Sequence, residues 1–162
     1  MRSTEMFEIR EVDSKLLARE RNQVIRQLRR ILPATVVSEV GSTAVKGVVG
    51  KQDLDFLVLV PRGRFRRTRD ILDQTFERDK QQHSDHEFQG YRLASAIGVA
   101  IQLTVKNGRH DVFGRFLNLL RADPEVRRAY NDLKFEWNLR SMNDYRAAKR
   151  EFIEKAIKKI ET

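Results

Sequence analysis

The feature that most constrains the fold is an uninterrupted apolar run, Phe56-Leu57-Val58-Leu59-Val60. Consecutive apolar residues cover both faces of an extended strand, which is typical of a strand buried from both sides. We therefore predict a strand over residues 54–60 that is central to a sheet. Pro61 and Gly63 follow directly and end the strand, because both residue types interrupt regular pairing.

Two aspartates stand at the start of this strand. Side chains alternate faces along a strand, so Asp53 and Asp55 are expected to point the same way, about 6.6 Å apart along the chain. Paired carboxylates suit magnesium, which prefers oxygen ligands and commonly bridges one or two carboxylates to substrate phosphates. We predict that both aspartates are metal ligands; the alternative is that they only terminate the strand in a turn.

A second group of candidate residues precedes the aspartates. Residues 35–40 form a predicted strand that ends at Gly41-Ser42, where glycine lets another group approach the backbone closely. Ser42 is predicted to open a short helical turn, whose outward N–H groups and hydroxyl suit an anionic phosphate. Lys46 and Lys51 can add positive charge, so these four residues are the predicted phosphate-binding group.

Apolar periodicity places the other elements. Steps of three and four residues predict helices over residues 14–32, 65–78 and 111–121, from Asp123-Pro124 onward, and from Ser141 or Asn143 to near the end. Residues 88–93 and 98–105 are predicted to be strands of an antiparallel hairpin. The second of these strands alternates, so Gln102 and Thr104 share a face that can look toward the two aspartates.

Length and composition fit one globular domain, which we expect to span residues 1–162. A chain of this length with 40% hydrophobic residues can bury an ordinary core, and the lack of cysteine excludes disulfides and thiolate metal sites. Residues 1–5 lack the apolar segment of a secretory signal, and no run approaches the roughly 20 apolar residues of a membrane span. We expect a cytoplasmic protein with no membrane association, and the sequence leaves its oligomeric state open.

The chain is strongly basic, with a formal net charge of +9 and a pI of about 10.2. Such a charge raises the local concentration of polyanions such as nucleotides and RNA. Most basic residues are nevertheless interleaved with acidic ones, as on a solvated helix face. The densest basic stretch, residues 62–69, follows the predicted central strand and can either face a polyphosphate or nucleic acid or only solubilise a helix.

A polar segment offers a second set of metal ligands. His83, Asp85, His86 and Glu87 are clustered there, although a solvated turn is the other interpretation, because no fourth ligand is fixed by spacing. His110 lies far along the chain and is interpreted as a helix-capping residue.

The stretch from Gly41 to Asp55 resembles the polymerase-beta-like nucleotidyltransferase superfamily, whose signature is a Gly-Ser turn followed by Asp-x-Asp on the next strand. Within that superfamily the sequence is most similar to the GrpB family. The positions that carry this resemblance are Gly41-Ser42-Thr43-Ala44-Val45, Gly47, Lys51 and Asp55, then residues 120–126 with Tyr130, Leu133 and Lys134, and finally Tyr145, Lys149 and Phe152.

The resemblance implies an α/β (α+β) fold, with a nucleotidyltransferase-like mixed sheet flanked by helices and a helical C-terminal region. It also implies binding of a nucleoside triphosphate with Mg²⁺ and transfer of a nucleotidyl group to an RNA, protein or small-molecule acceptor. Carried over by position, Gly41 and Ser42 hold the terminal phosphates, while Asp53 and Asp55 ligate magnesium and are the catalytic residues.

One strand departs from the superfamily pattern. It reads Gln102-Leu103-Thr104 where GrpB members often have His-x-His and active nucleotidyltransferases have a third acid. Neither glutamine nor threonine is a general base near neutral pH, so we assign Gln102 and Thr104 to the acceptor side, with Glu87 or His86 as candidate bases.

Two functions from different classes follow from this departure. One is a magnesium-dependent nucleotidyltransferase, and the other is a non-catalytic nucleotide- or RNA-binding module that has lost the third catalytic carboxylate. A third possibility, a role beside coenzyme A biosynthesis, comes only from the resemblance, because GrpB-like domains occur fused to dephospho-coenzyme A kinases.

Overall fold

A computed structural model describes residues 5–162. Met1 to Thr4, which belong to the stretch on which the absence of a secretory signal was predicted, lie outside the described residues. The chain forms two compact units. The sheet unit comprises residues 12–41 and 53–114, and the helical unit comprises residues 5–11, 42–52 and 115–162. Each unit is therefore assembled from separate segments of the chain.

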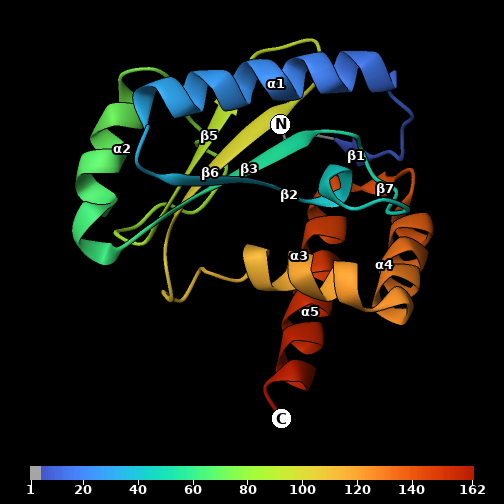
Figure 1. Cartoon of the computed structure of the whole chain (residues 1–162). Helices are drawn as coiled ribbons and strands as arrows, with labels where there is room; N and C mark the ends of the chain where they lie inside the picture. The colour runs from blue at the N-terminus through green and yellow to red at the C-terminus, as the bar shows by residue number, and fades with distance from the viewer. Residues whose placement is uncertain (1–4) are drawn as a thin grey trace. The chain divides into compact units, whose positions relative to one another are not determined.

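The sheet unit contains a mixed sheet. Its strands, in spatial order, are β2 (Val36–Val40), β3 (Leu54–Val60), β6 (Val99–Val105), β5 (Phe88–Leu93) and β4 (Glu77–Arg78). β3 and β6 run parallel, whereas the other neighbouring strands are antiparallel. β3 has a partner on each side, so the predicted mixed sheet with an interior apolar strand is confirmed (Figure 1).

Two helices of the sheet unit, α1 (Ser14–Ile31) and α2 (Phe65–Asp73), share one hydrophobic core with the sheet. α1 starts after Asp13, whose carboxylate accepts a hydrogen bond from the Lys15 N–H. The fully buried residues of this core include Leu28 of α1, Leu72 of α2, and Leu54, Phe56 and Val58 of β3. Since side chains alternate along a strand, Asp55, Leu57 and Leu59 lie on the opposite face of the sheet.

The predicted helix over residues 65–78 is too long. α2 ends at Asp73, and Glu77–Arg78 form the short strand β4 beside β5. Arg78 reaches back to Asp73 in a bidentate ion pair, with N–O distances of 2.8 and 2.6 Å. Phe76 is buried from the connecting turn. In the sequence, Phe76 fits the helical spacing of the apolar residues before it, although α2 ends three residues earlier, at Asp73.

The helical unit contains α4 (Pro124–Trp137), α5 (Met142–Ile160) and most of α3 (Phe113–Ala122), the part from Arg115 onward. Asp123 accepts hydrogen bonds from two N–H groups in the first turn of α4, and Pro124 occupies the first helical position, as predicted. Ring contacts at centroid distances of 5.1 to 6.2 Å join the three helices, each of which contributes one aromatic residue: Phe116, Tyr130 and Phe152.

A short ribbon completes the helical unit. β1 (Met6–Phe7) pairs antiparallel with β7 (Arg140–Ser141), and the Phe7 ring stacks on Tyr145. The sequence did not predict this ribbon, because a two-residue strand has no measurable periodicity. Along residues 5–162, every helix is too short or too polar to span a bilayer.

Candidate functional site

The carboxylate of Asp55 packs against the backbone of Gly41. Gly41 follows β2 directly, and the preceding Val40 is paired with Asp55 in the antiparallel register. A β-carbon added to Gly41 would lie 2.5 Å from Asp55 Oδ2, so a larger residue would displace this carboxylate. Gly41 also has a φ of +78°, which side chains disfavour. The group that approaches the glycine backbone is therefore the aspartate itself.

Asp53 has an equivalent arrangement next to β6, which pairs with the edge of β3 opposite to β2. The Leu54 N–H donates to the Gly98 carbonyl at 2.9 Å, which brings the start of β3 beside the residue that precedes β6. A β-carbon added to Gly98 would lie 2.7 Å from Asp53 Oδ1 and 2.8 Å from its Cγ. Gly98 was not predicted from the sequence to be part of the site. A glycine at the start of a predicted strand was the available signal, because it marks a close approach to the backbone.

Asp53 directly precedes β3 and Asp55 is its second residue, so the alternation of side chains assigns both aspartates to one face of the sheet. Leu54 lies between them and is fully buried toward the helices, whereas both aspartates are partly exposed. Two carboxylates on one face provide the oxygen donors that magnesium prefers, and partial exposure leaves room for the waters that this ion retains. The residues present therefore fit a magnesium ion.

Gln102 and Thr104 lie on the same face as the aspartates. In the parallel register Asp55 pairs with Ala100, Leu57 with Gln102 and Leu59 with Thr104, and side chains of paired residues point to one side. Gln102 Oε1 and Thr104 Oγ1 are buried and have no hydrogen-bond partner among residues 5–162. The side chain directly beside Asp55 is that of Ala100, so β6 brings no carboxylate to this face.

Glu87 lies at the other end of β6 from Asp55. Its carbonyl accepts a hydrogen bond from Val105 N–H at 3.1 Å, five residues beyond Ala100 and thus about 16 Å along the strand. A hydrogen bond from the Arg62 guanidinium lowers the pKa of the Glu87 carboxyl. Glu87, and with it the neighbouring His86, is therefore wrongly placed to act as a base beside Asp55.

The helical unit contains the Ser42 turn. Ser42 opens a short 3₁₀ helix, η1 (Ser42–Ala44), which agrees with the predicted helical turn. A β-carbon added to Gly50 would lie 2.6 Å from Ser42 Oγ and 3.1 Å from Lys134 Nζ, so the hydroxyl and the ammonium flank the same glycine. Of the two predicted lysines, Lys46 is exposed and Lys51 lies 3.6 Å from the Glu5 carboxylate.

Lys134 was not predicted from the sequence to be a site residue. Its side chain is only 3% exposed, its Nζ donates to the Val49 carbonyl at 2.7 Å, and the ammonium lies 4.3 Å from the centroid of the Tyr130 ring. A buried ammonium needs such partners. In the sequence, Lys134 was one of many basic residues and stood out only through the family resemblance.

Comparisons with known proteins identify the family and the fold of this chain. The GrpB protein family model matches residues 8–159. A UPF0157 protein of Vibrio cholerae serotype O1 is 26% identical over 132 residues, which cover 81% of this chain and 70% of that protein. The crystal structure of the conserved protein GrpB from Enterococcus faecalis matches with a TM-score of 0.72 at 19% identity, over 95% of this chain and 99% of that chain.

Nucleotidyltransferases are also structurally similar. A structure of Cid1, which has RNA terminal uridylyl transferase activity, matches with a TM-score of 0.53 at 16% identity, over 77% of this chain and 40% of that one. A Cid1 poly(U) polymerase mutant bound to MgATP matches with a TM-score of 0.51 at 16% identity, over 77% and 42% of the two chains. These similarities confirm the predicted nucleotidyltransferase-like fold, and this chain spans less than half of Cid1.

Proposed function

We propose that this chain, which belongs to the GrpB family, binds a nucleoside triphosphate with Mg²⁺ and transfers a nucleotidyl group to an acceptor. The observation that carries the proposal is the pair Asp53 and Asp55, each held against a glycine on the same face of a nucleotidyltransferase-like sheet. The related fold of Cid1, which has been determined bound to MgATP, supports the same ligand class.

The proposed roles follow from the chemistry of each residue. Asp53 and Asp55 would hold the metal, and the backbone of the Gly41-Ser42 turn with the serine hydroxyl would donate hydrogen bonds to phosphate oxygens. Bound magnesium would neutralise the triphosphate and stabilise the leaving pyrophosphate. The ammonium of Lys134, beside the Ser42 hydroxyl, would balance phosphate charge from within the protein. The exposed Lys46 and the partly buried Lys51 would attract the polyanion.

A second candidate function is favoured by Gln102 and Thr104. No acid of β6 accompanies Asp53 and Asp55, and Glu87 lies several residues away along the strand. An acceptor hydroxyl on this face would meet an amide and a hydroxyl, neither of which removes a proton near neutral pH. The chain would then be a nucleotide- or RNA-binding module without transfer.

Thermal denaturation with each of the four common nucleoside triphosphates, with and without Mg²⁺, tests the shared part of both candidates. We expect stabilisation that requires the metal, of about 2.7 kcal/mol at a ligand concentration 100-fold above Kd. An Asp53→Asn, Asp55→Asn double variant should lose it. An Asp70→Asn, Asp132→Asn variant is the matched control, because it removes the same charge from exposed positions.

Pyrophosphate release then separates the two candidates. Release that depends on an added RNA or small-molecule acceptor favours transfer, whereas saturable binding without release favours the module. Binding that persists in the Asp53, Asp55 double variant and weakens steeply with salt would refute the site, because such behaviour is that of nonspecific polyanion affinity.

Two broader expectations belong to the same proposal. We propose that residues 1–162 act as one domain, because neither unit is a continuous piece of chain. A cytoplasmic location, where nucleoside triphosphates are available, is proposed with the activity.

A further inference from the structure

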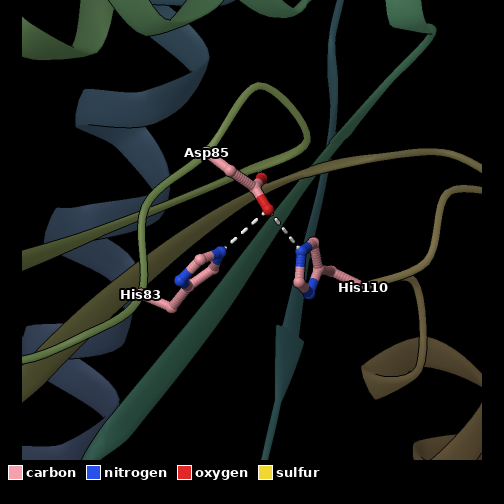
Figure 2. A group of neighbouring side chains, drawn as sticks. All are labelled: His83, Asp85 and His110. Carbon is pink, nitrogen blue, oxygen red and sulfur yellow. Dashed lines mark hydrogen bonds and ion pairs between the residues drawn. The ribbon is translucent and has the colours of Figure 1, made fainter.

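Three side chains of the sheet unit converge at a point that the proposed nucleotide site does not use. Asp85 Oδ2 lies 2.9 Å from His83 Nε2 and 2.9 Å from His110 Nε2 (Figure 2). His83 and Asp85 come from the segment between β4 and β5, and His110 comes from the segment after β6. One ligand atom from each of the three residues lies within 4.8 Å of the other two.

The carboxylate at the centre is held in a fixed orientation. Asp85 Oδ1 accepts hydrogen bonds from the backbone N–H groups of Glu87 and Phe88, at 2.8 and 2.9 Å. These bonds leave Oδ2 directed at the imidazoles. Burial raises the pKa of the Asp85 carboxyl, but the Glu87 backbone hydrogen bond and the contacts with His110 and His83 outweigh burial and keep the pKa well below its usual value. Asp85 is therefore an anionic carboxylate at neutral pH.

The cluster is buried on one side and open on the other. The His110 ring packs against Phe88 at a centroid distance of 5.6 Å, and its side chain is 29% exposed. Asp85 is 13% exposed, whereas His83 is 69% exposed. Solvent therefore reaches the cluster from the His83 side, where a bound ion could keep a water ligand.

We propose that His83, Asp85 and His110 form a binding site for a divalent transition-metal ion, with Zn²⁺ as its preferred ion. Two imidazole nitrogens and one carboxylate oxygen are a donor set typical of zinc, and three protein ligands leave the fourth tetrahedral position to water. Ligand atoms about 2.0–2.1 Å from a tetrahedral zinc lie about 3.4 Å from one another. The contacts of 2.9 Å to Asp85 are about half an ångström shorter than this separation, and the ligand atoms of His83 and His110 lie within 4.8 Å of each other. Mg²⁺ is not the expected ion, because it prefers oxygen ligands and two of these three donors are imidazole nitrogens.

The neighbouring arginine does not block the site. Arg109 Nη2 lies 3.3 Å from Asp85 Oδ2, but its Nε also lies 3.3 Å from Glu87 Oε2. When a metal ion takes Asp85 Oδ2, the guanidinium keeps the second carboxylate as a partner.

This site is separate from the proposed magnesium site. Phe88, which contacts His110, pairs with Thr104, whereas Asp55 pairs with Ala100. Thr104 lies four residues beyond Ala100, which is about 13 Å along β6. Zinc binding is therefore independent of the nucleotide proposal, and either can fail alone.

Calorimetric titration of Zn²⁺ into tag-free, chelator-treated full-length protein tests the inference. His83, His86 and His110 are the three histidines of the chain, so His86→Ala is a matched control within the same segment as His83. We expect one ion per chain, unchanged affinity in His86→Ala, and a loss of at least about 100-fold in His83→Ala and in His110→Ala, since even second-shell changes cost 10- to 100-fold. Co²⁺ should give the intense visible absorption of a four-coordinate site in the wild type and not in these two variants.

Other outcomes would overturn the inference. No saturable zinc binding would mean that the three residues form only a hydrogen-bonded contact between two loops. Equal losses in His83→Ala and His86→Ala, or zinc binding abolished by the Asp53→Asn, Asp55→Asn double variant, would place the ion elsewhere. Asp85→Asn keeps an oxygen that can accept from the Glu87 and Phe88 N–H groups but replaces the oxygen that faces the imidazoles with an amide nitrogen, so this variant should also lose zinc affinity while circular dichroism and thermal denaturation without metal show that it folds.

Discussion

A single methyl group at Gly98 should weaken magnesium-dependent triphosphate binding without removing any charge. The β-carbon of Gly98→Ala would lie 2.8 Å from Asp53 Cγ, whereas ordinary contact begins at 3.4 Å. The carboxylate must therefore retreat by at least about 0.6 Å, which exceeds the roughly 0.5 Å tolerance of a functional constellation. Magnesium also requires near-ideal octahedral distances, so we expect an affinity loss on the order of 10- to 100-fold.

Folding should survive this change. Gly98 is exposed and its φ is outside the left-handed region, so alanine restricts the unfolded chain and gains roughly 0.4–1 kcal/mol, which offsets the strain at Asp53. We expect the free energy of unfolding in urea to change by less than about 1 kcal/mol. Gly63→Ala is the matched control, because an added β-carbon there meets nothing within 4 Å.

Isothermal titration with triphosphate, in magnesium and in chelator, measures both variants against the wild type. Wild-type affinity in a folded Gly98→Ala protein would refute the reasoning, because the position of Asp53 would then be irrelevant to binding. A loss in Gly63→Ala of the same size would equally refute it, since the effect would not be specific to the aspartate.

Three further predictions concern stability. Lys134→Met should lower the free energy of unfolding by about 1–3 kcal/mol in urea denaturation, because it removes the charged donor of the 2.7 Å hydrogen bond to the partly buried Val49 carbonyl; unchanged stability would contradict this account. Thr104→Val should leave the free energy of unfolding unchanged or raise it by up to about 1 kcal/mol, since the hydroxyl that it removes is buried without a hydrogen-bond partner in residues 5–162. A clear decrease in the free energy of unfolding would contradict this, because it would show that the hydroxyl makes a hydrogen bond. The hydrogen bond from Arg78 lowers the pKa of Asp73, so its contribution is fully present above about pH 4 and is lost as the pH falls below that value. Asp73→Asn should therefore flatten the acid limb of the stability curve, and an unchanged limb would show that this pair does not control it.

The sequence predicts most of the sheet unit because its central signal is local. The apolar run of β3 requires burial on both faces, and the two aspartates at its start are the only polar residues of that stretch, so strand and candidate ligands are identified together. The family resemblance, confirmed by the match to residues 8–159, includes Asp55 of this stretch together with residues 41–51 and positions in the C-terminal helices. The end of α2 could not be predicted, because Phe76 fits a helical stripe and is also buried from a turn.

Contacts between distant segments were not predictable. Gly98 approaches Asp53 across 45 residues, and His110 meets Asp85 across 25 residues, in a segment that local pattern assigned to helix capping. Neither pair has a spacing that predicts contact, since each depends on the register of β3, β6 and β5. Lys134 illustrates the same limit, because burial distinguishes it from other lysines and burial is a property of the fold.

Buried polar atoms on one face of the sheet argue that this face is retained for binding rather than for stability. Of the four buried side-chain atoms that lack a hydrogen-bond partner within residues 5–162, Gln102 Oε1, Thr104 Oγ1 and Gln82 Oε1 belong to this face, and the fourth, Arg69 Nε, belongs to α2. Gln82 covers Gly90, which pairs with Gln102. Each unpaired buried group costs roughly 1–3 kcal/mol, and an apolar side chain would remove that cost. The opposite face, packed by α1 and α2, carries the apolar core. Unpaired buried polar groups are expected where function requires them. Here Gln102 and Thr104 lie on the same face of the sheet as Asp55. If Thr104→Val stabilises the protein and weakens triphosphate or acceptor binding, the polar face is a binding surface; if it stabilises the protein with no effect on any ligand, this argument fails.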